Sequence, residues 1–339
     1  MLLHEDKDAF RVLIEDINER TGYRTDILEK DYYVVLILKE LAELQQQGLP
    51  AYFKGGTALY KALKSTNRFS EDIDLSVDTR NCTTSQNNKR LERATKKYTS
   101  LLRDSSAGKT NRHEVVSVYT YEPITPFDKN DALQRFGKLK IEATSFTISE
   151  PVTDLDVSAM IYDLATDEQK EILEQQFDVL PFSVKTITME RIFVDKLFAA
   201  ESYIRKSDEP HRAFEAAKHI YDLSVLLQND RIQALLQSNA LLSRLLRIRM
   251  EEEQNRLDGI PMVLPRQFTF FTEAGVNPKV SAAYETMQRQ YVLSKKDRIS
   301  FADAARALQK IQEELLQNAA WMQCSLPKTE VKRSYDHSL

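Results

Sequence analysis

The sequence YFKGGTALYKALKSTNRFSEDIDLSV, residues 52–77, decides the fold of this chain. Its apolar start leads into the glycine pair Gly55 and Gly56, and an apolar, helix-like run follows at residues 58–63. Glycine suits a sharp turn and lets the backbone approach a ligand closely, because it has no Cβ. The stretch therefore predicts a short strand, a glycine turn and a helix in direct succession.

The second half of the same stretch places Asp72 and Asp74 on one face of a predicted strand. Successive side chains of a strand point to opposite faces. The aspartates therefore alternate with apolar residues that are expected to be buried, namely Ile73, Leu75 and Val77. Two carboxylates held side by side repel one another unless a cation or a proton lies between them. The pattern favours a hard, oxygen-preferring ion such as Mg2+.

The glycine turn predicts a phosphate site beside the two aspartates. Backbone amides at a helix N-terminus attract anions. Here Thr57 adds a hydroxyl, and Lys61 adds a positive charge one helical turn later. We expect Gly55, Gly56, Thr57 and Lys61 to contact a nucleotide, although the two glycines alone are also typical of a plain tight turn.

The hydrophobic pattern divides the chain into a helix-rich α+β protein with few strands. Two amphipathic helices fill residues 1–49, and a small α/β unit with a mixed β-sheet follows at 50–150. Residues 151–185 are predicted to be a connector with one short helix, and 186–324 a helical C-terminal domain. The polar residues 325–339 have no periodicity and are expected to form a flexible tail.

The composition argues against several classes of protein. The formal net charge is −4, so any contact with nucleic acid would need local basic patches. Cys82 and Cys324 lie far apart, which argues against a disulfide scaffold or a zinc cluster and fits a reducing compartment. The N-terminus has no signal-peptide pattern, and no apolar run approaches the roughly 20 residues of a membrane helix. We expect a cytoplasmic protein with no membrane partner.

Several motifs resemble those of a known group of enzymes. A glycine pair, a helix and a Ser-x-Asp-x-Asp pattern resemble the signature of DNA polymerase β-type nucleotidyltransferases. More narrowly, KGGTALYK at residues 54–61 and RFSEDIDL at residues 68–75 resemble the AbiEii/AbiGii toxin family of toxin–antitoxin and phage-defence systems. Further similarity is found in EKDYY at residues 29–33, KIE at residues 140–142 and YDL at residues 221–223.

The resemblance implies a role for residues that the pattern alone leaves open. It implies that Glu142 is a third metal-binding carboxylate beside Asp72 and Asp74, in a site for two Mg2+ ions. It also implies that Ser70 and Lys196 hold the nucleotide, and that Lys196 is part of the catalytic set with Asp72, Asp74 and Asp222. His219 stands where the family usually has an acid, so a second acid beside Asp222 is not expected.

The residues themselves also permit simpler interpretations. Lys140 and Glu142 fit a charged strand face beside solvent, and Lys196 fits a lysine that extends out of an apolar helix stripe. The charged residues 29–31 fit a solvated helix face. A basic run at residues 89–97, and the further basic residues Arg244, Arg247 and Arg249, fit either an RNA contact or ordinary surface.

The expected activity is transfer of a nucleoside monophosphate from an NTP to an acceptor, with Mg2+ and release of pyrophosphate. The resemblance implies a toxin that modifies the 3′ end of tRNA, inhibits translation or growth, and has a cognate antitoxin protein. Two alternatives remain open at this stage. The acceptor is a protein or a small molecule in one, and the chain is a non-catalytic, nucleotide-binding module in the other.

Overall fold

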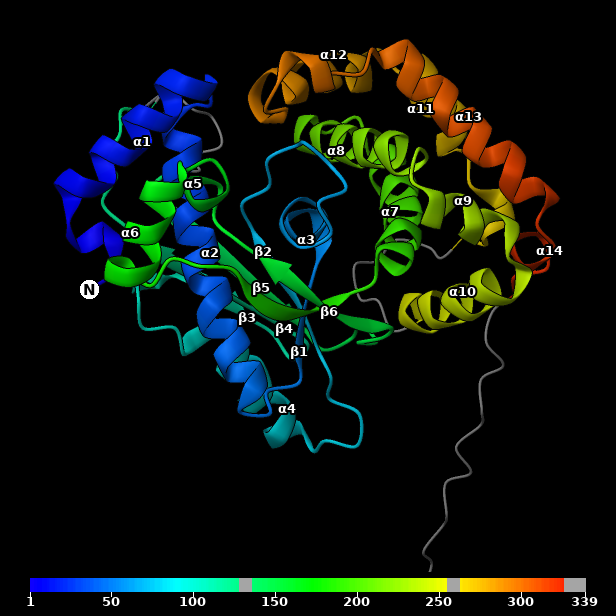
Figure 1. The fold of residues 1–339 in the computed structure, drawn as a ribbon. Helices are drawn as coiled ribbons and strands as arrows, with labels where there is room; N and C mark the ends of the chain where they lie inside the picture. Colours follow the sequence, from blue (N-terminus) through cyan, green and yellow to red (C-terminus); the bar gives the residue numbers. More distant parts are fainter. Residues whose placement is uncertain (128–135, 255–262, 326–339) are drawn as a thin grey trace, which may run out of the picture.

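A mixed seven-stranded sheet forms the centre of the molecule, with the strand order β3-β4-β5-β2-β1-β7-β6. A computed structural model describes residues 1–127, 136–254 and 263–325 of the chain (Figure 1). The strands are β1 Ala51–Lys54, β2 Ile73–Val77, β3 Leu102–Thr110, β4 Glu114–Thr120, β5 Lys138–Thr144, β6 Val152–Val157 and β7 Phe182–Ile187. The predicted helix-rich α+β class is confirmed, and residues 326–339 of the expected tail lie outside the described residues.

The strand register decides which side chains share a face of the sheet. Strand β2 is antiparallel to β1 and parallel to β5, with Asp74 paired to Glu142. The neighbouring positions on both strands are apolar and fully buried, among them Ile73, Leu75 and Ile141. One face of the sheet is therefore core, and the opposite face carries the acidic residues.

The sheet extends further than the sequence predicts. The polar, glycine-containing sequence of residues 105–111 predicts a loop, but most of these residues belong to β3, an exposed and irregular edge strand. The expected connector at residues 151–185 contains β6 and most of β7 as well as the predicted short helix. Strand β7 pairs with β1 and β6, so this segment completes the sheet instead of merely linking two domains.

The N-terminal helices pack around the apolar side of the sheet. They are the 3-10 helix η1 Leu3–Glu5, followed by α1 Lys7–Thr21, α2 Thr25–Gln46, α4 Thr84–Lys96, α5 Met160–Asp163 and α6 Asp167–Phe177. Helix α2 contacts β7, and α4 contacts β4 and β5. The side chain of Asp6 caps α1, and Gly22 ends that helix in a left-handed conformation.

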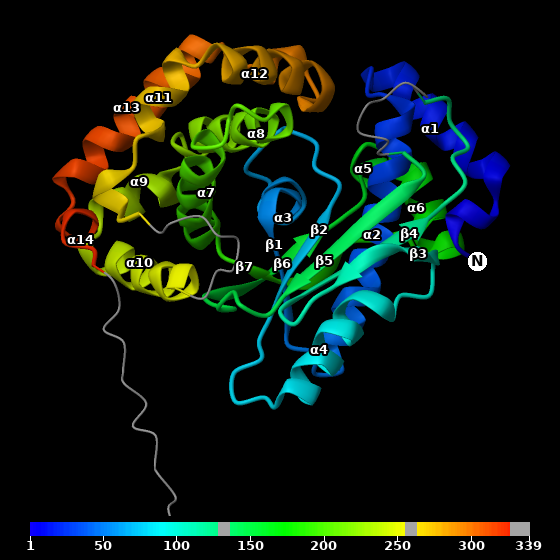
Figure 2. The same ribbon diagram turned by 180° about the vertical axis from the view of Figure 1, so that it is seen from behind.

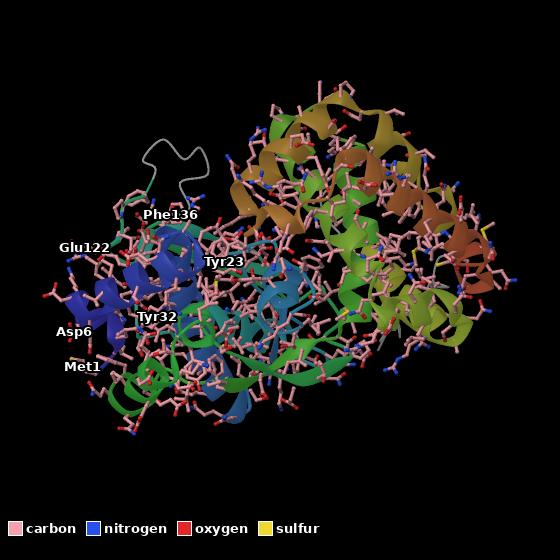
Figure 3. All side chains as sticks on the ribbon, turned by 45° about the horizontal axis from the view of Figure 1, so that its top comes forward. Met1, Asp6, Tyr23, Tyr32, Glu122 and Phe136 are labelled. Atoms are coloured by element: carbon pink, nitrogen blue, oxygen red, sulfur yellow. The ribbon has the colours of Figure 1, made fainter. Side chains whose placement is uncertain are left out.

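Aromatic side chains join the first two helices to the loop after β4. The ring of Tyr32 lies 4.7 Å from that of Phe10, and Tyr33 stacks on Tyr121 at 4.0 Å. Lys7 adds an exposed ion pair to Glu122 at 2.6 Å. Figure 3 shows Tyr32, Asp6 and Glu122 together at this end of the molecule. The two tyrosines of the EKDYY motif are therefore core residues.

The C-terminal half is a separate layer of helices beside the sheet. It contains α7 Met189–Ile204, α8 Pro210–Leu226, α9 Asp230–Gln237, α10 Asn239–Gln254, α11 Phe270–Val276, α12 Pro278–Tyr291, α13 Phe301–Gln317 and α14 Ala319–Met322, with 3-10 helices η2 Pro265–Gln267 and η3 Lys295–Asp297. The single helix predicted at residues 231–253 is divided in two near Ser238. Figures 1 and 2 show α3, Gly55–Lys61, between this layer and the sheet.

The helical layer also holds the segment that leads into β2. The backbone N–H of Phe69 donates to the carbonyl of Tyr291 at 2.8 Å, and that of Leu293 donates to Asn67 at 3.1 Å. Arg68 and Val292 form an isolated antiparallel bridge. The end of α12 therefore fixes the backbone just before Asp72. No helix in the described ranges combines the length and the apolar character that crossing a membrane requires.

Candidate active site

Three carboxylates meet on the polar face of the sheet. Asp74 lies on β2 opposite Glu142 on β5, and Asp72 directly precedes β2. Parallel pairing at this register puts Asp74 and Glu142 on the same face, and Asp72 is two residues from Asp74. The structure thus brings together all three residues that were predicted to bind metal.

The carboxylates repel one another strongly. Burial, followed by the charges of Glu142 and Asp72, raises the pKa of Asp74 to about 7. Lys140, also on β5, lies 2.9 Å from Asp72 Oδ2 and 3.7 Å from Glu142 Oε2, so its ammonium offsets part of this negative charge. The face is arranged to hold positive charge between its carboxylates.

The donor set fits Mg2+ although the side chains are not in a ligating arrangement. Within the described residues, no group of three or more acidic, histidine or cysteine side chains is positioned as a ready ligand set. The Lys140 ammonium lies between Asp72 and Glu142, where it supplies the cationic charge itself. Clustered carboxylate oxygens are the ligands that Mg2+ prefers. Asp72, Asp74 and Glu142 would therefore hold the ion once Lys140 moves aside.

The two glycines bring backbone against the carboxylates and the residues beside them. Gly55 has φ +80°, and a Cβ at this position would overlap Oδ2 of Asp74. A Cβ on Gly56 would lie 2.9 Å from Nη2 of Arg68 and 3.0 Å from Oγ of Ser70. Only glycine fits these close approaches, and at Gly55 only glycine adopts the conformation without strain. The turn therefore shapes the floor of the site.

Two predicted nucleotide contacts are directed elsewhere. Thr57 is fully buried, and its hydroxyl donates to the carbonyl of Asp72 and to Ser70 Oγ, so it holds the segment before β2. Lys61 is buried and pairs with Asp31 of α2 at 2.8 Å. Neither side chain lines the cavity described below. One helical turn rotates Lys61 into the core, which is why sequence spacing alone misplaces it.

A buried charge cluster joins the segment before β2 to the helical layer. Arg68 donates to both carboxylate oxygens of Asp222 on α8, at 3.0 and 2.8 Å, and Lys196 on α7 donates to the same group at 2.6 Å. Burial alone would raise the pKa of Asp222, but the two cations hold it well below its usual range. Asp222 stays ionised and orients both cations.

This geometry corrects the role expected for Asp222. Its side chain is fully buried and does not line the cavity, whereas Arg68 and Lys196 do. Asp222 is therefore a positioning residue and not a catalytic one. Lys196 does not extend to solvent, because its ammonium is bound inside the protein. Arg68, which the motif RFSEDIDL contains, was not identified from the sequence because its partner is more than 150 residues away.

A cavity of ≈ 480 Å³ lies between the sheet and helices α7, α8 and α10. This volume is typical of small-molecule sites. The sheet side contributes Asp72, Asp74 and Glu142 with Gly55, Gly56 and Ser70. Arg68 lines the cavity as well. The helical side contributes Lys196 and a further group of polar residues, namely Tyr203, Arg212, Lys218, His219 and Arg249. The predicted nucleotide residues Gly55, Gly56, Ser70 and Lys196 thus share one cavity with the carboxylates.

The helical end of the cavity combines aromatic rings and cations. His219 stacks on Tyr203 with ring centroids 5.4 Å apart, and Arg212 lies over the same tyrosine. Burial, and then the charge of Lys196, lowers the pKa of His219 well below its usual value, so the imidazole is neutral. Where the family usually has an acid, this chain therefore places an uncharged polar ring.

The charged EKD residues at positions 29–31 do not form a solvated face. Each is only 1% exposed. Glu29 accepts from the backbone amides of Ile124 and Thr125, and Lys30 donates to the carbonyl of Lys138 at the start of β5. Lys30 also lies 3.6 Å from Glu71, next to Asp72. The motif therefore supports the strands that carry the carboxylates.

A second buried ion network lines the cavity and was missed by sequence reasoning. Arg191 and Glu252 pair at 2.6 Å between α7 and α10, and Asp195 bonds Arg191 at 3.1 Å and Arg249 at 3.3 Å. Arg249 is thus mostly engaged inside the protein, and it is not a free basic surface residue. The sequence does contain an indication of this network, because charged residues interrupt the apolar stripes of α7 and α10.

Comparisons with known proteins agree with the predicted family. The model of the nucleotidyl transferase AbiEii toxin, of a type IV toxin–antitoxin system, matches residues 36–310. Among solved structures, the MenT4 nucleotidyltransferase toxin of Mycobacterium tuberculosis H37Rv is similar at 14% sequence identity and a TM-score of 0.47, over 89% of this chain and 98% of that chain. No curated protein matches the sequence. The family match includes most of the helical layer, beyond the residues that carry the sequence resemblance.

Proposed function

The chain belongs to the AbiEii family of nucleotidyltransferase toxins, and from this membership we propose that it transfers a nucleoside monophosphate from an NTP to the 3′ end of tRNA. The transfer uses Mg2+, releases pyrophosphate and inhibits translation. The family match supports a transferase of this chemical type and an antitoxin partner. The tRNA acceptor and the cytoplasmic site of action belong to the proposal.

One observation carries the proposal. A single cavity has three converging carboxylates on one wall and the ammonium of Lys196 with the guanidinium of Arg68 on the other. An NTP needs both, because the metal-bound side of its phosphates faces carboxylates and the free phosphate oxygens face cations. A non-catalytic nucleotide module would not require three mutually repelling carboxylates at one position.

The proposed reaction joins the 3′ oxygen of the acceptor to the α-phosphorus of the NTP. One P–O bond forms there, and the bond from the α-phosphorus to the β-bridging oxygen breaks. Pyrophosphate leaves with the electron pair of that bond, and the hydroxyl proton passes to solvent. Such transfers depend mostly on positioning and on charge stabilisation.

The residues of the chain have distinct tasks in this step. Asp72, Asp74 and Glu142 would hold Mg2+, and the ion would make the attacking hydroxyl more acidic and stabilise the departing negative charge. Ser70, with its hydroxyl beside the glycine turn, and Arg68 and Lys196 bind the triphosphate. Asp222 keeps the two cations in place, since it bonds both of them.

The glycine turn brings backbone close to the carboxylates more than it adds a helix-end charge. Helix α3 has only 7 residues and begins at Gly55. Because Gly55 has no side chain, the carboxylate of Asp74 packs directly against the turn. Gly55 and Gly56 line the same cavity as Asp74, and in the proposed complex they contact the nucleotide through their backbone.

A transfer assay tests the proposal. Purified protein is incubated with Mg2+, each α-32P-labelled NTP in turn, and either total tRNA or a bacterial lysate. Label in tRNA, removed by 3′ exonuclease digestion and absent without Mg2+, is the expected result. Label in protein or in a small molecule would show that the acceptor belongs to that class and is not tRNA. Mg2+-dependent NTP binding without any transfer would show a non-catalytic module and overturn the proposal.

A further inference from the structure

A second cavity, of ≈ 560 Å³, adjoins the carboxylate cavity. It lies where β2 and β5 end, against residues 78–80 and 145–149. Phe146 and Thr147 line both cavities, so the two spaces meet at this loop. Neither the family match nor the carboxylate chemistry assigns a role to this second space.

The loop between the two cavities is held firmly from both sides. Ser76 Oγ contacts Thr147 Oγ1 at 2.7 Å and Ser149 Oγ at 2.8 Å. From the helical layer, Glu252 accepts from the amide of Ile148, and Arg191 donates to the Ile148 carbonyl at 3.2 Å. The half-buried Phe146 is thus presented by a backbone that is already ordered. A ligand that stacks on its ring would not have to order the loop.

The walls of the second cavity suit a nucleotide. Arg80, Arg112 and His113 contribute basic groups, and hydroxyl and amide side chains contribute hydrogen-bonding groups. Arg80 is paired with Asp78 at 2.8 Å, but the side chain of Arg80 is 58% exposed, so its guanidinium can also contact a phosphate. Guanidinium groups bind phosphate in a bidentate manner. Aromatic rings provide stacking faces for unpaired bases.

The chain connects this cavity to the reacting groups over a short distance. Glu142 and Phe146 are four residues apart, and four residues of extended chain span at most about 14 Å. An acceptor whose terminal hydroxyl lies at Glu142 would therefore have its last nucleotides beside Phe146. In the proposed function the NTP occupies the carboxylate cavity, so the second space is available to the other substrate.

We propose that the second cavity binds the single-stranded 3′ end of an RNA acceptor. In it a base stacks on Phe146, Arg112 and Arg80 bind the phosphates, and the terminal hydroxyl is directed towards Glu142. This inference rests on the proposed nucleotidyl transfer and adds the place where its acceptor binds. It assigns Phe146 and Arg112 to acceptor binding and leaves NTP binding to the other cavity.

Two substitutions separate acceptor binding from NTP binding. Phe146→Leu removes the aromatic face while keeping an apolar side chain, and Arg112→Gln removes an exposed charge. We expect each to raise the KM for tRNA by about tenfold, with the Kd for NTP and the thermal midpoint unchanged. Arg103→Gln is the matched control, because Arg103 is an exposed residue of β3 outside both cavities.

A direct binding measurement keeps the inference testable if no transfer to RNA occurs. A fluorescein-labelled, single-stranded RNA is titrated into the wild-type protein and the three variants. Weaker binding by Phe146→Leu and Arg112→Gln, but not by Arg103→Gln, supports the cavity even if the wild type labels no tRNA and the proposed function fails. Equal RNA binding by all four proteins, an equal loss of NTP binding, or an effect confined to a protein acceptor overturns the inference.

Discussion

The two sides of the carboxylate cavity treat negative charge in opposite ways, one at the sheet wall itself and the other just behind the helical lining. On the sheet wall, Asp74 lies beside Glu142 and Asp72, and its pKa is raised to about 7. Where the helical layer meets the core, Asp222 lies between Arg68 and Lys196, and its pKa is held far below the usual range. The first carboxylate lacks a sufficient counter-charge, and the second has more than one. Asp74, whose negative charge is not balanced, is the group expected to bind a cation. Asp222, whose charge is balanced by two cations, stabilises the fold.

Neutralising the sheet wall should have the largest effect on activity. Asp74→Asn removes a metal-binding oxygen, and the loss of several kcal/mol of transition-state stabilisation lowers transfer by about 10³-fold. Because the substitution also relieves repulsion, the thermal midpoint should stay the same or rise. Transfer assays and thermal unfolding, measured on the same preparation, check the expected loss of activity and the expected thermal midpoint. Transfer at the wild-type rate would remove Asp74 from the site.

Breaking the charge cluster should instead affect the fold. Asp222→Ala leaves Arg68 and Lys196 buried without their shared partner, and removal of one member of a buried pair costs about 3 kcal/mol or more. Urea unfolding measures this loss. Glu122→Ala, which breaks only the exposed pair with Lys7, serves as the control and should change stability by roughly 0.5 kcal/mol or less. Equal losses for the two variants would contradict the contrast between the walls.

A methyl group at the glycine turn should disturb the sheet wall locally. At Gly55→Ala the new Cβ overlaps Asp74 Oδ2, and a displacement of about 1 Å can reduce activity roughly 10²-fold. Gly48→Ala is a matched control, because Gly48 has φ +84° and no atom within 4 Å of a built Cβ. Both variants should lose about 1 kcal/mol of stability, since both are strained. Only Gly55→Ala should lose activity, and comparable activities would show that the close approach is unimportant.

The last prediction concerns the pH dependence of stability, and its sign differs between Asp74 and Asp222. In metal-free protein, Asp74 has a raised pKa, so its contribution to stability falls as pH rises from 4 towards 7, by about 1 kcal/mol per pH unit at most. Asp222 has a depressed pKa, so its contribution is present above about pH 4 and is lost as pH falls below it. Unfolding curves of wild type and Asp74→Asn from pH 4 to 8 test this. The wild type alone should lose stability as pH rises from 4 to 7, and the loss should level off above pH 7.

The sheet wall was more predictable from sequence than the helical wall. Asp72 and Asp74 follow the two-residue alternation of strands, and this local rule places them on one face whatever the rest of the fold. Glu142 lies on another strand, and it was expected beside them because of the family resemblance. The same rule does not specify which strands are neighbours, so β3, β6 and β7 were missed. Strand β3 is exposed, β6 lies in an acidic segment between Pro151 and Pro181, and β7 begins directly after Pro181.

Residues of the helical wall depend on contacts between distant parts of the chain. Lys196 was assigned to the nucleotide because of the family resemblance, and the same resemblance assigned its partner Asp222 to catalysis although Asp222 is fully buried. Lys61 was assigned to the nucleotide because it follows the glycine turn, yet it points to Asp31. Sequence spacing predicts which side of one helix a residue occupies, but it does not predict what that side will contact.

The backbone bridge between residues 67–69 and 291–293 has a consequence for how the protein is made. Asp72 and Asp74 are synthesised early, but the segment before Asp72 receives these backbone partners only from the end of α12. A nascent chain that has not yet released residue 293 from the ribosome lacks this support. Toxic activity is therefore expected to arise only near the completion of translation, well after Asp72 and Asp74 have been synthesised.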